Sequence, residues 1–396
     1  MSKNRFVPGL GIRGVGDPFS ESRAPNPSPE PRAPNPRVPS PQSPTPNPEP
    51  PTTENTTMTL PESIQCYLVT KDDAGKVSCE LTKRPSAELP EGEVTIRVAY
   101  SSLNYKDALA FTGHPGVTRV FPNVPGVDAT GVVVESGAYE FVPGDPVLVT
   151  GFDMGMGRWG GYAEYVRVPQ DWIVPLPDGL TLRESMILGS AGLTAGLCID
   201  ALQRHGVEPD AGEVVVTGAS GGVGSCAVAV LAKLGYRVVA VTGKTSAGDY
   251  LTKLGAGRII GRQEVDDHSN RAMLPGRWAG AVDTVGGNIL ATILRGTRHS
   301  GCVAACGLTA GADLSMTVYP FILRGVTLAG IDSGWCADAQ RHETWQRLGR
   351  PWKPDDLETI AEFIALADLP PRIQQILAGG ITGRVVVTVG GDDVGD

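Results

Sequence analysis

The pattern of apolar and polar residues changes once along the chain, near residue 189. Between about 64 and 187 the apolar stretches are short, rich in β-branched and aromatic residues, and separated by Gly, Pro and Asp. This spacing is typical of an antiparallel, barrel-like domain. The expected strands lie at IQCYLV, EVTIRVAYSSL, GVVVES, DPVLVTG and GYAEYVRV.

From about 189 onward, short apolar strands alternate with helical patterns. Strands are expected at EVVVTG, RVVAVTG, AGAVDTVG and GCVAACG, and helices at GVGSCAVAVLAKLG and AGDYLTKLGA. Such alternation predicts a doubly wound parallel sheet and therefore an α/β fold. A last helix is expected near 355–366. The final apolar stretch, GRVVVTVG, is expected to be a strand that returns to the first domain.

The first 57 residues differ from the rest in composition, because they hold 15 of the 33 prolines and few apolar residues. Proline fixes φ and donates no hydrogen bond, so residues 1–60 are expected to be a disordered Pro-rich tail, partly in polyproline II conformation. Two interpretations stay open. The tail is either a docking segment with PxxP sites or an upstream extension without function, before an alternative start at Met58.

Composition argues against several kinds of partner. The net charge is −9 and no basic tract is interleaved with aromatic residues, so no nucleic-acid partner is expected. No apolar run reaches the ~20 residues of a membrane helix, and no secretory signal begins the chain. The seven cysteines lack framework spacing, which predicts reduced thiols and a cytoplasmic location. The close pair Cys302 and Cys306 has no second Cys/His pair nearby, so no metal site is expected.

A glycine-rich loop joins the first strand of the parallel half to its helix. VVVTGASGGVGS carries the pattern AxGxxG, with Ala219, Gly221 and Gly224. Gly221 lets backbone approach a pyrophosphate, and Gly224 lets the helix pack closely on the strand. The helix N-terminus offers N–H groups and a positive dipole end to phosphates. A loop of this kind between a strand and a helix predicts a dinucleotide site.

The next strand ends in Thr242, Gly243 and Lys244, where an NAD site usually has an acidic residue on the ribose 2′-hydroxyl. No acidic residue occurs between 237 and 245. Thr242 and Lys244 would instead hydrogen-bond and neutralise a 2′-phosphate, and Arg262 is a candidate second cation. This strand end therefore predicts NADPH in preference to NADH.

With these features, residues 64–389 resemble the medium-chain dehydrogenase/reductase superfamily. Zinc-holding members carry a Cys and a Gly-His-Glu turn, whereas here Asn104 to Asp107 contain no thiolate and GVD at 126–128 lacks the imidazole. The cysteine-rich zinc lobe is also missing, so the chain resembles the zinc-free, quinone-oxidoreductase-like division. The ordered set LNYKDALA, WGGYAE, VTGASGGVGS, DTVGG, GCVAACGL, PFILRGV and GIDS resembles its acryloyl-CoA reductase (YhdH-type) family.

The resemblance implies a domain organisation and a set of cofactor contacts. A GroES-like catalytic domain would cover 61–188, an NADPH-binding Rossmann domain 189–352, and a return to the catalytic domain 353–396. Where the family usually has Ser-Gly-Arg after the second strand, this chain has Thr-Gly-Lys. The implied NADPH contacts are Tyr105, Ser220, Gly221, Gly222, Val223, Thr242, Gly243, Lys244, Arg262, Leu308, Ile322, Ser333 and Arg384.

The implied reaction is NADPH-dependent reduction of the carbon–carbon double bond of acryloyl-CoA to propanoyl-CoA. Hydride adds to the β-carbon, hydrogen-bond donors hold the charge on the thioester oxygen, and a side chain or water protonates the α-carbon. Tyr105 and Asn104 are the catalytic candidates. Tyr105 either donates a hydrogen bond or a proton or only positions the nicotinamide, while Asn104 and Asp107 are expected to fix the loop geometry.

Further assignments concern the substrate and the partners. FTGHPG at 111–116 is expected at the entrance, with His114 an exposed loop residue. Arg119, Arg158 and Arg324 are candidates for the CoA phosphates. One alternative is an NADPH quinone or enone oxidoreductase on the same fold, and a remoter one is a non-catalytic NADPH-sensing or nucleic-acid-binding protein. Family analogy implies a homo-oligomer, either a dimer or a tetramer.

Overall fold

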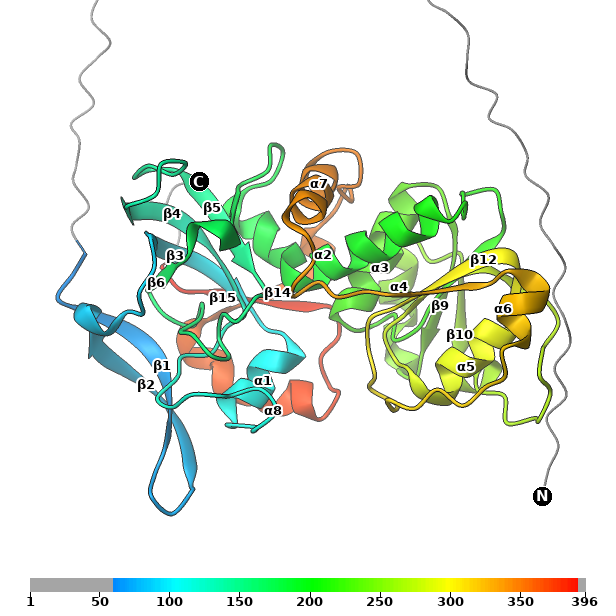
Figure 1. The fold of residues 1–396 in the computed structure, drawn as a ribbon, viewed down its shortest axis with the longest axis horizontal. Coiled ribbons are helices and arrows are strands. Elements are labelled where there is room, and N and C mark those ends of the chain that lie inside the picture. The colour runs from blue at the N-terminus through cyan, green and yellow to red at the C-terminus, as the bar shows by residue number, and fades with distance from the viewer. Residues whose placement is uncertain (1–59, 391–396) are drawn as a thin grey trace, which may run out of the picture. The chain divides into compact units, whose positions relative to one another are not determined.

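The computed structural model of the chain describes residues 60–390 (Figure 1). The Pro-rich tail predicted for 1–60 lies outside the described residues, except for its last position. The described residues belong to one compact unit. Two large sheets, described in turn below, account for most of its strands.

The first sheet is built mainly from antiparallel strands of the N-terminal half, in the order β14-β15-β3-β4-β5-β7. Strand β6 also pairs with β3, and β1 and β2 form a separate antiparallel pair. Val94, Ile96 and Val98 alternate along β3 and are fully buried, and the residues between them are also buried except for the half-buried Arg97, so both faces of this strand are covered. The strands are β1 (Ser63–Lys71), β2 (Val77–Pro85), β3 (Val94–Ser102), β4 (Asp128–Ser136), β5 (Pro146–Thr150), β6 (Tyr165–Val168), β7 (Ile173–Pro175), β14 (Ala361–Ala365) and β15 (Arg384–Thr388).

The second sheet is parallel throughout, in the order β10-β9-β8-β11-β12-β13. Because the chain runs outward from β8 in one direction and then from β11 in the other, the switch point lies between these two strands. Its strands are β8 (Glu213–Val216), β9 (Arg237–Thr242), β10 (Arg258–Gly261), β11 (Trp278–Asp283), β12 (Thr297–Ala305) and β13 (Thr327–Gly330). The helices that accompany it are α3 (Gly222–Lys233), α4 (Gly248–Lys253), α5 (Gly287–Gly296) and α6 (Tyr319–Arg324). The predicted α/β fold with a barrel-like first domain is confirmed.

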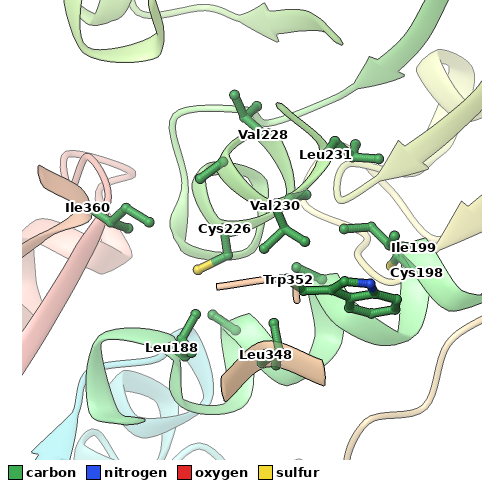
Figure 2. Packing of buried hydrophobic residues seen from close by; sticks show 14 of the residues in the cluster. Leu188, Cys198, Ile199, Cys226, Val228, Val230, Leu231, Leu348, Trp352 and Ile360 are labelled. Carbon is green, nitrogen blue, oxygen red and sulfur yellow. The ribbon is translucent and has the colours of Figure 1, made fainter. Parts of the chain in front are cut away.

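Helix α2 (Leu182–Arg204) contacts strands of both sheets and packs against α3 and α7 (Asp338–Gly349). It begins with a capping box, in which Thr181 Oγ1 accepts from the Glu184 N–H at 3.1 Å. Figure 2 shows Leu188, Cys226 and Leu348 gathered in the apolar cluster that these helices share. Contrary to the sequence expectation, α2 is long and apolar enough to cross a membrane, but 89% of its most apolar window is buried inside the protein. This burial identifies α2 as a core helix.

The predicted helix at 355–366 is wrong. Leu357 and Ile360 are buried as a helical pattern would require, but 361–365 form strand β14, which pairs in parallel with β15. Pairing with a neighbouring strand outweighs the helical preference of Ala361, Glu362 and Ala365. The last helix is instead α8 (Leu369–Leu377). Strand β2 was not predicted, because its alternating exposed face makes VSCELTKRP appear polar in sequence.

Candidate active site

The glycine-rich loop lies at the carboxyl end of β8 and leads into α3, with Gly221 as the N-cap. A Cβ on Gly224 would lie 2.3 Å from the Gly218 carbonyl oxygen, so only glycine allows this close packing of helix on loop. The Ser220 and Thr242 hydroxyls are 2.9 Å apart, which joins the loop to the end of β9. The N-terminus of α3, with its free N–H groups, therefore lies next to the strand end where a 2′-phosphate is expected.

Two cations stand at that strand end. The guanidinium of Arg262 covers Gly243, where an added Cβ would lie 2.7 Å from Arg262 Nε. Lys244 Nζ donates to the Ile381 carbonyl and, at 3.3 Å, to Thr382 Oγ1. Burial and the nearby charge of Arg262 lower the pKa of Lys244. Neither cation forms an ion pair with a carboxylate of residues 60–390, so no carboxylate there neutralises either charge.

A buried polar network lies beside the loop, around Asp128 at the start of β4. Its carboxylate accepts from the Ser102 hydroxyl at 2.5 Å, from Asn104 Nδ2 at 2.8 Å and from the Ser190 N–H at 3.0 Å. The last bond is possible because α2 is kinked at Gly189, which has φ 52° and ψ −155°. A Cβ there would lie 2.6 Å from Asp128 Oδ2, so the kink requires glycine.

Arg384, at the start of β15, supplies the cation of this network. Its guanidinium donates to Asn104 Oδ1 at 3.0 Å and to Ser102 Oγ at 2.7 Å, and lies 3.8 Å from the Asp128 carboxylate. The residue is only 2% exposed. It lies directly under the loop, since a Cβ on Gly222 would come within 3.1 Å of Arg384 Nη1. Arg384, one of the predicted NADPH contacts, therefore packs against the glycine-rich loop.

Asp107 in helix α1 (Tyr105–Phe111) is the second buried carboxyl group. It accepts from the Val127 N–H and the Asn104 N–H, both at 2.8 Å. Complete burial and the negative charge of Asp128 raise its pKa to about 7. These bonds fix Asn104 at the N-cap of α1 and so determine where Tyr105 begins the helix.

The raised pKa of Asp107 makes stability depend on pH. In the unfolded chain the carboxyl group ionises near its ordinary value of 3.8, whereas the folded protein keeps the proton up to about 7. Between these values unfolding releases a proton, so the free energy of unfolding falls as pH rises, by up to about 1.4 kcal/mol per pH unit. Asp107→Asn cannot titrate, so its stability is expected to fall less steeply with pH in urea unfolding between about pH 5 and 7. Parallel pH profiles for the two proteins would contradict the assignment.

The structure brings most of the predicted site residues into two adjoining groups. Ser220 to Val223, Thr242, Gly243, Lys244 and Arg262 surround the loop, and Asn104 and Arg384 lie in the network beneath it. Tyr105 is 50% exposed at the start of α1. Leu308 and Ser333 follow the carboxyl ends of β12 and β13. They therefore lie at the same end of the parallel strands as the glycine-rich loop, which follows β8. Ile322 lies on α6 and is 67% exposed.

Several residues of the network were missed in the sequence. In the sequence, Asp128 was considered only as part of a turn that lacks a histidine. Ser102 and Ser190 were not predicted to be site residues. The only local signal was the small polar residues in YSSLN and LGSAG, and such residues are too common at strand and helix ends to indicate a buried network. One substrate candidate is also excluded as a free cation. Arg324 donates to the carbonyls of Leu274, Arg295 and Thr297, so its guanidinium serves the packing of α6.

Two further observations bear on the location and chemistry of the site. Surface cavities of about 240 and 370 Å³ are lined by residues around 205–211 and 298–301, and around 267–272 and 315–317. Neither includes a residue of the glycine loop, so we place the site by its chemistry. Among residues 60–390, no group of three His, Cys, Asp or Glu side chains could hold a metal ion, and all seven cysteines are free thiols.

Comparison with known families agrees with this arrangement of two domains around a dinucleotide loop. Residues 90–178 match the alcohol dehydrogenase GroES-like domain, and residues 222–349 match the family described as zinc-binding dehydrogenase. The chain belongs to the medium-chain dehydrogenase/reductase superfamily.

Individual relatives narrow the position within the superfamily. The chain is 46% identical to the acrylyl-CoA reductase AcuI of Ruegeria pomeroyi over 81% of its own length and 98% of that protein. It is 45% identical to Bacillus subtilis YhfP, which is named as a quinone oxidoreductase, over 81% of its length and 97% of that protein. The structure of the yhdH oxidoreductase of Salmonella enterica in complex with NADP has 47% identity and a TM-score of 0.79, and covers 82% of this chain and 99% of that one. The chain belongs to the AcuI/YhdH branch.

Proposed function

We propose that the protein is an NADPH-dependent acryloyl-CoA reductase, which reduces the carbon–carbon double bond of acryloyl-CoA to the single bond of propanoyl-CoA. The geometric observation that carries the cofactor assignment is the pair of cations, Lys244 and Arg262, beside the glycine loop. The substrate assignment is supported by the 46% identity to AcuI over nearly the whole of that protein.

The residues present fit NADPH. The α3 N–H groups and Ser220 hydroxyl offer donors to the pyrophosphate, and Lys244 and Arg262 offer charge to the 2′-phosphate. When bound, NADPH supplies the hydride that adds to the β-carbon of the enoyl thioester. The protein's part is to hold the substrate in line, exclude water and stabilise charge on the thioester oxygen.

Two residues at the start of α1 have different parts in this scheme. Both polar ends of the Asn104 amide are engaged, one by Asp128 and the other by Arg384, so Asn104 acts by positioning. Tyr105 lies next to it and is half exposed. We therefore assign to Tyr105 either the hydrogen bond to the developing enolate or the proton transfer to the α-carbon.

The assignment is tested by NADPH consumption with acryloyl-CoA, crotonyl-CoA and a benzoquinone under identical conditions. We expect the highest kcat/KM with acryloyl-CoA. The name of YhfP favours a second candidate, an NADPH quinone or enone oxidoreductase, which a higher kcat/KM with the benzoquinone would establish instead. NADPH binding without turnover of any of the three would favour the remoter sensor or nucleic-acid-binding function.

The enzyme is expected to need no metal. Where other members hold zinc, Asn104 to Asp107 contain no thiolate and GVD at 126–128 lacks the imidazole. Dialysis against a chelator should therefore leave the rate of NADPH consumption unchanged. A loss of activity that added zinc restores would overturn this expectation.

We further propose a cytoplasmic homo-oligomer, either a dimer or a tetramer. Apolar side chains gather at exposed positions of α6 and the segment before it, where Val318, Ile322 and Leu323 are 54–67% exposed. Strand β13 next to them is an edge strand, which leaves backbone groups free for pairing with a second copy. Light scattering would measure the mass in solution, and a monomer would contradict the proposal.

A further inference from the structure

Three aromatic side chains meet at a place that the site described above does not include. Phe152 stacks on Trp172 with ring centroids 5.1 Å apart and an angle of 1°. Trp335 meets the same Phe152 ring edge-on, at 5.7 Å and 89°. Trp335 is nevertheless 59% exposed, so a large aromatic face is left open to solvent beside the cluster. We call Phe152, Trp172 and Trp335 the aromatic cluster.

The backbone around the aromatic cluster is held firmly. Phe152 has a φ of 54°, in the left-handed region that non-glycine residues rarely adopt, and its N–H donates to the Gly334 carbonyl at 3.1 Å. Asp332 Oδ1 accepts from the N–H groups of Gly334 and Trp335 at 3.0 and 3.2 Å. These hydrogen bonds fix the backbone of the loop that carries the exposed Trp335 indole.

A buried arginine joins the two loops that carry the cluster. Arg341 in α7 is 1% exposed and donates to the Thr150 carbonyl at 2.7 Å and to the Ser333 and Gly334 carbonyls at 3.1 and 3.0 Å. Its guanidinium also lies 4.1 Å from the centroid of the Phe152 ring. Thr150 ends a strand of the first sheet and Ser333 follows a strand of the second, so Arg341 holds both sides together.

Cations border the aromatic cluster. The Arg158 guanidinium lies 5.6 Å from the Trp172 ring centroid and donates to the Glu91 carbonyl. Arg119 joins the same segment through its N–H, which donates to the Met156 carbonyl at 3.2 Å. The Arg119 side chain is 58% exposed and forms an ion pair with Asp153 at 3.0 Å. One exposed aromatic face, that of Trp335, with guanidinium groups on neighbouring segments is suited to a base that carries phosphates.

The cluster adjoins the active site on the side away from the cofactor's 2′-phosphate. Thr150 lies opposite Asp128 in the β4–β5 register, and the Ser333 hydroxyl accepts from Thr194 at 2.6 Å. Trp335 follows β13, the outermost strand on one side of the parallel sheet. Lys244 follows β9, which is next to the outermost strand on the opposite side. The two places are therefore separate, and both open on the carboxyl ends of the strands.

We propose that the aromatic cluster, with Arg119 and Arg158, binds the 3′-phosphorylated ADP end of the coenzyme A thioester. The adenine base stacks on Trp335, and the two arginines meet the phosphates, with Arg119 released from Asp153. This subsite rests on the proposed function, because it is the acyl-CoA substrate that brings the nucleotide. Of the three candidate arginines, Arg158 lies over Trp172 and Arg119 contacts Asp153 next to Phe152, whereas Arg324 lies on α6.

The test compares two substrates that share the reacting group and differ in the nucleotide, acryloyl-CoA and acryloyl-pantetheine. Trp335→Ala is expected to lower kcat/KM for acryloyl-CoA relative to acryloyl-pantetheine by about 5- to 150-fold, the range for one base stacked on an aromatic ring. Most of the change should lie in KM. Trp335→Phe should retain most of the preference, and Arg119→Gln should lower it and weaken its dependence on salt.

Tyr139→Ala is the matched control, because that ring is 101% exposed on the barrel domain and should not affect the preference. Equal losses on both substrates would overturn the subsite and make Trp335 a wall of the active site. A change in oligomeric mass without a change in substrate preference would also overturn it and assign the cluster to a protein interface.

A direct binding measurement separates this inference from the proposed function. Titration of the wild-type chain with coenzyme A should quench tryptophan fluorescence, and Trp335→Phe should remove most of the change. Quenching that depends on Trp335, in a protein that fails to reduce acryloyl-CoA, would uphold the subsite and refute the reaction. Absence of CoA binding in a protein that reduces both thioesters equally would refute the subsite alone.

Discussion

Replacing Lys244 with Ala is expected to reduce kcat/KM for NADPH by about 10- to 150-fold, because a hydrogen bond to a charged group contributes roughly 1.5–3 kcal/mol. NADH has no phosphate at this position, so its kcat/KM should change little. Lys244→Arg should be neutral or tighter, since the guanidinium fork matches a phosphate better than an ammonium does. Arg262→Ala should show a smaller loss in the same direction. The measurement is steady-state kinetics with both cofactors and acryloyl-CoA, supported by NADPH fluorescence titration.

The contacts of Lys244 in the structure call for a control. Its ammonium group donates to the Ile381 carbonyl and to Thr382 Oγ1. Removing the ammonium group therefore also removes two hydrogen bonds that hold the segment before β15. Thr382→Ala removes the side-chain partner and keeps the cation, and it should leave the NADPH/NADH ratio unchanged. Thr242→Asp should shift preference further toward NADH, because a carboxylate repels the phosphate and accepts from a 2′-hydroxyl. Equal losses for both cofactors in Lys244→Ala would make Lys244 a positioning residue.

Replacing Arg384 with Met should cost about 3–5 kcal/mol of the free energy of unfolding, the usual effect of removing one partner of a buried ion pair. Asp128 is fully buried and would lose its cation, and Asn104 and Ser102 would each lose a donor. Denaturant unfolding measures the loss. Since Arg384 lies beneath Gly222, weaker NADPH binding should accompany the loss of stability.

Two further variants separate this network from the general cost of losing an arginine. Arg372→Met removes a partly exposed ion pair between Arg372 of α8 and Glu362 of β14, and it should cost no more than about 1 kcal/mol. The double change Arg384→Met with Asp128→Asn should be more stable than Arg384→Met alone, because an amide replaces the unpaired carboxylate. If Arg384→Met unfolds at the same denaturant concentration as the wild type, the network does not stabilise the fold.

Much of the fold and half of the site were predictable because their signals are local. The apolar strand β8, the loop with Gly221 and Gly224, and the helix after it follow one another within a few turns of chain. Local steric limits and hydrogen-bonding needs act on neighbouring residues, so such a run indicates a dinucleotide site without knowledge of the rest. The absence of an acid beside Lys244 was equally visible, because the strand end lies a fixed distance from the loop.

Other features depended on partners that are distant in sequence. The residues of β14 have a helical pattern, and only pairing with β15 makes them a strand. Arg384 resembles any strand-end arginine until the fold places it against Asp128 and Asn104. The Gly189 kink and the aromatic cluster likewise exist only because several loops converge.

Sequence alone therefore determined the α/β fold, the dinucleotide loop and the cation at the end of β9, since each depends on backbone conformation and charge within a short segment. Tertiary structure decided which polar groups are buried together. It held the Asn104 amide between Asp128 and Arg384, engaged Arg324 in packing and left Trp335 exposed beside Phe152. The physical reason is that burial, desolvation and ion pairing depend on where distant segments meet, and a local pattern carries no record of that.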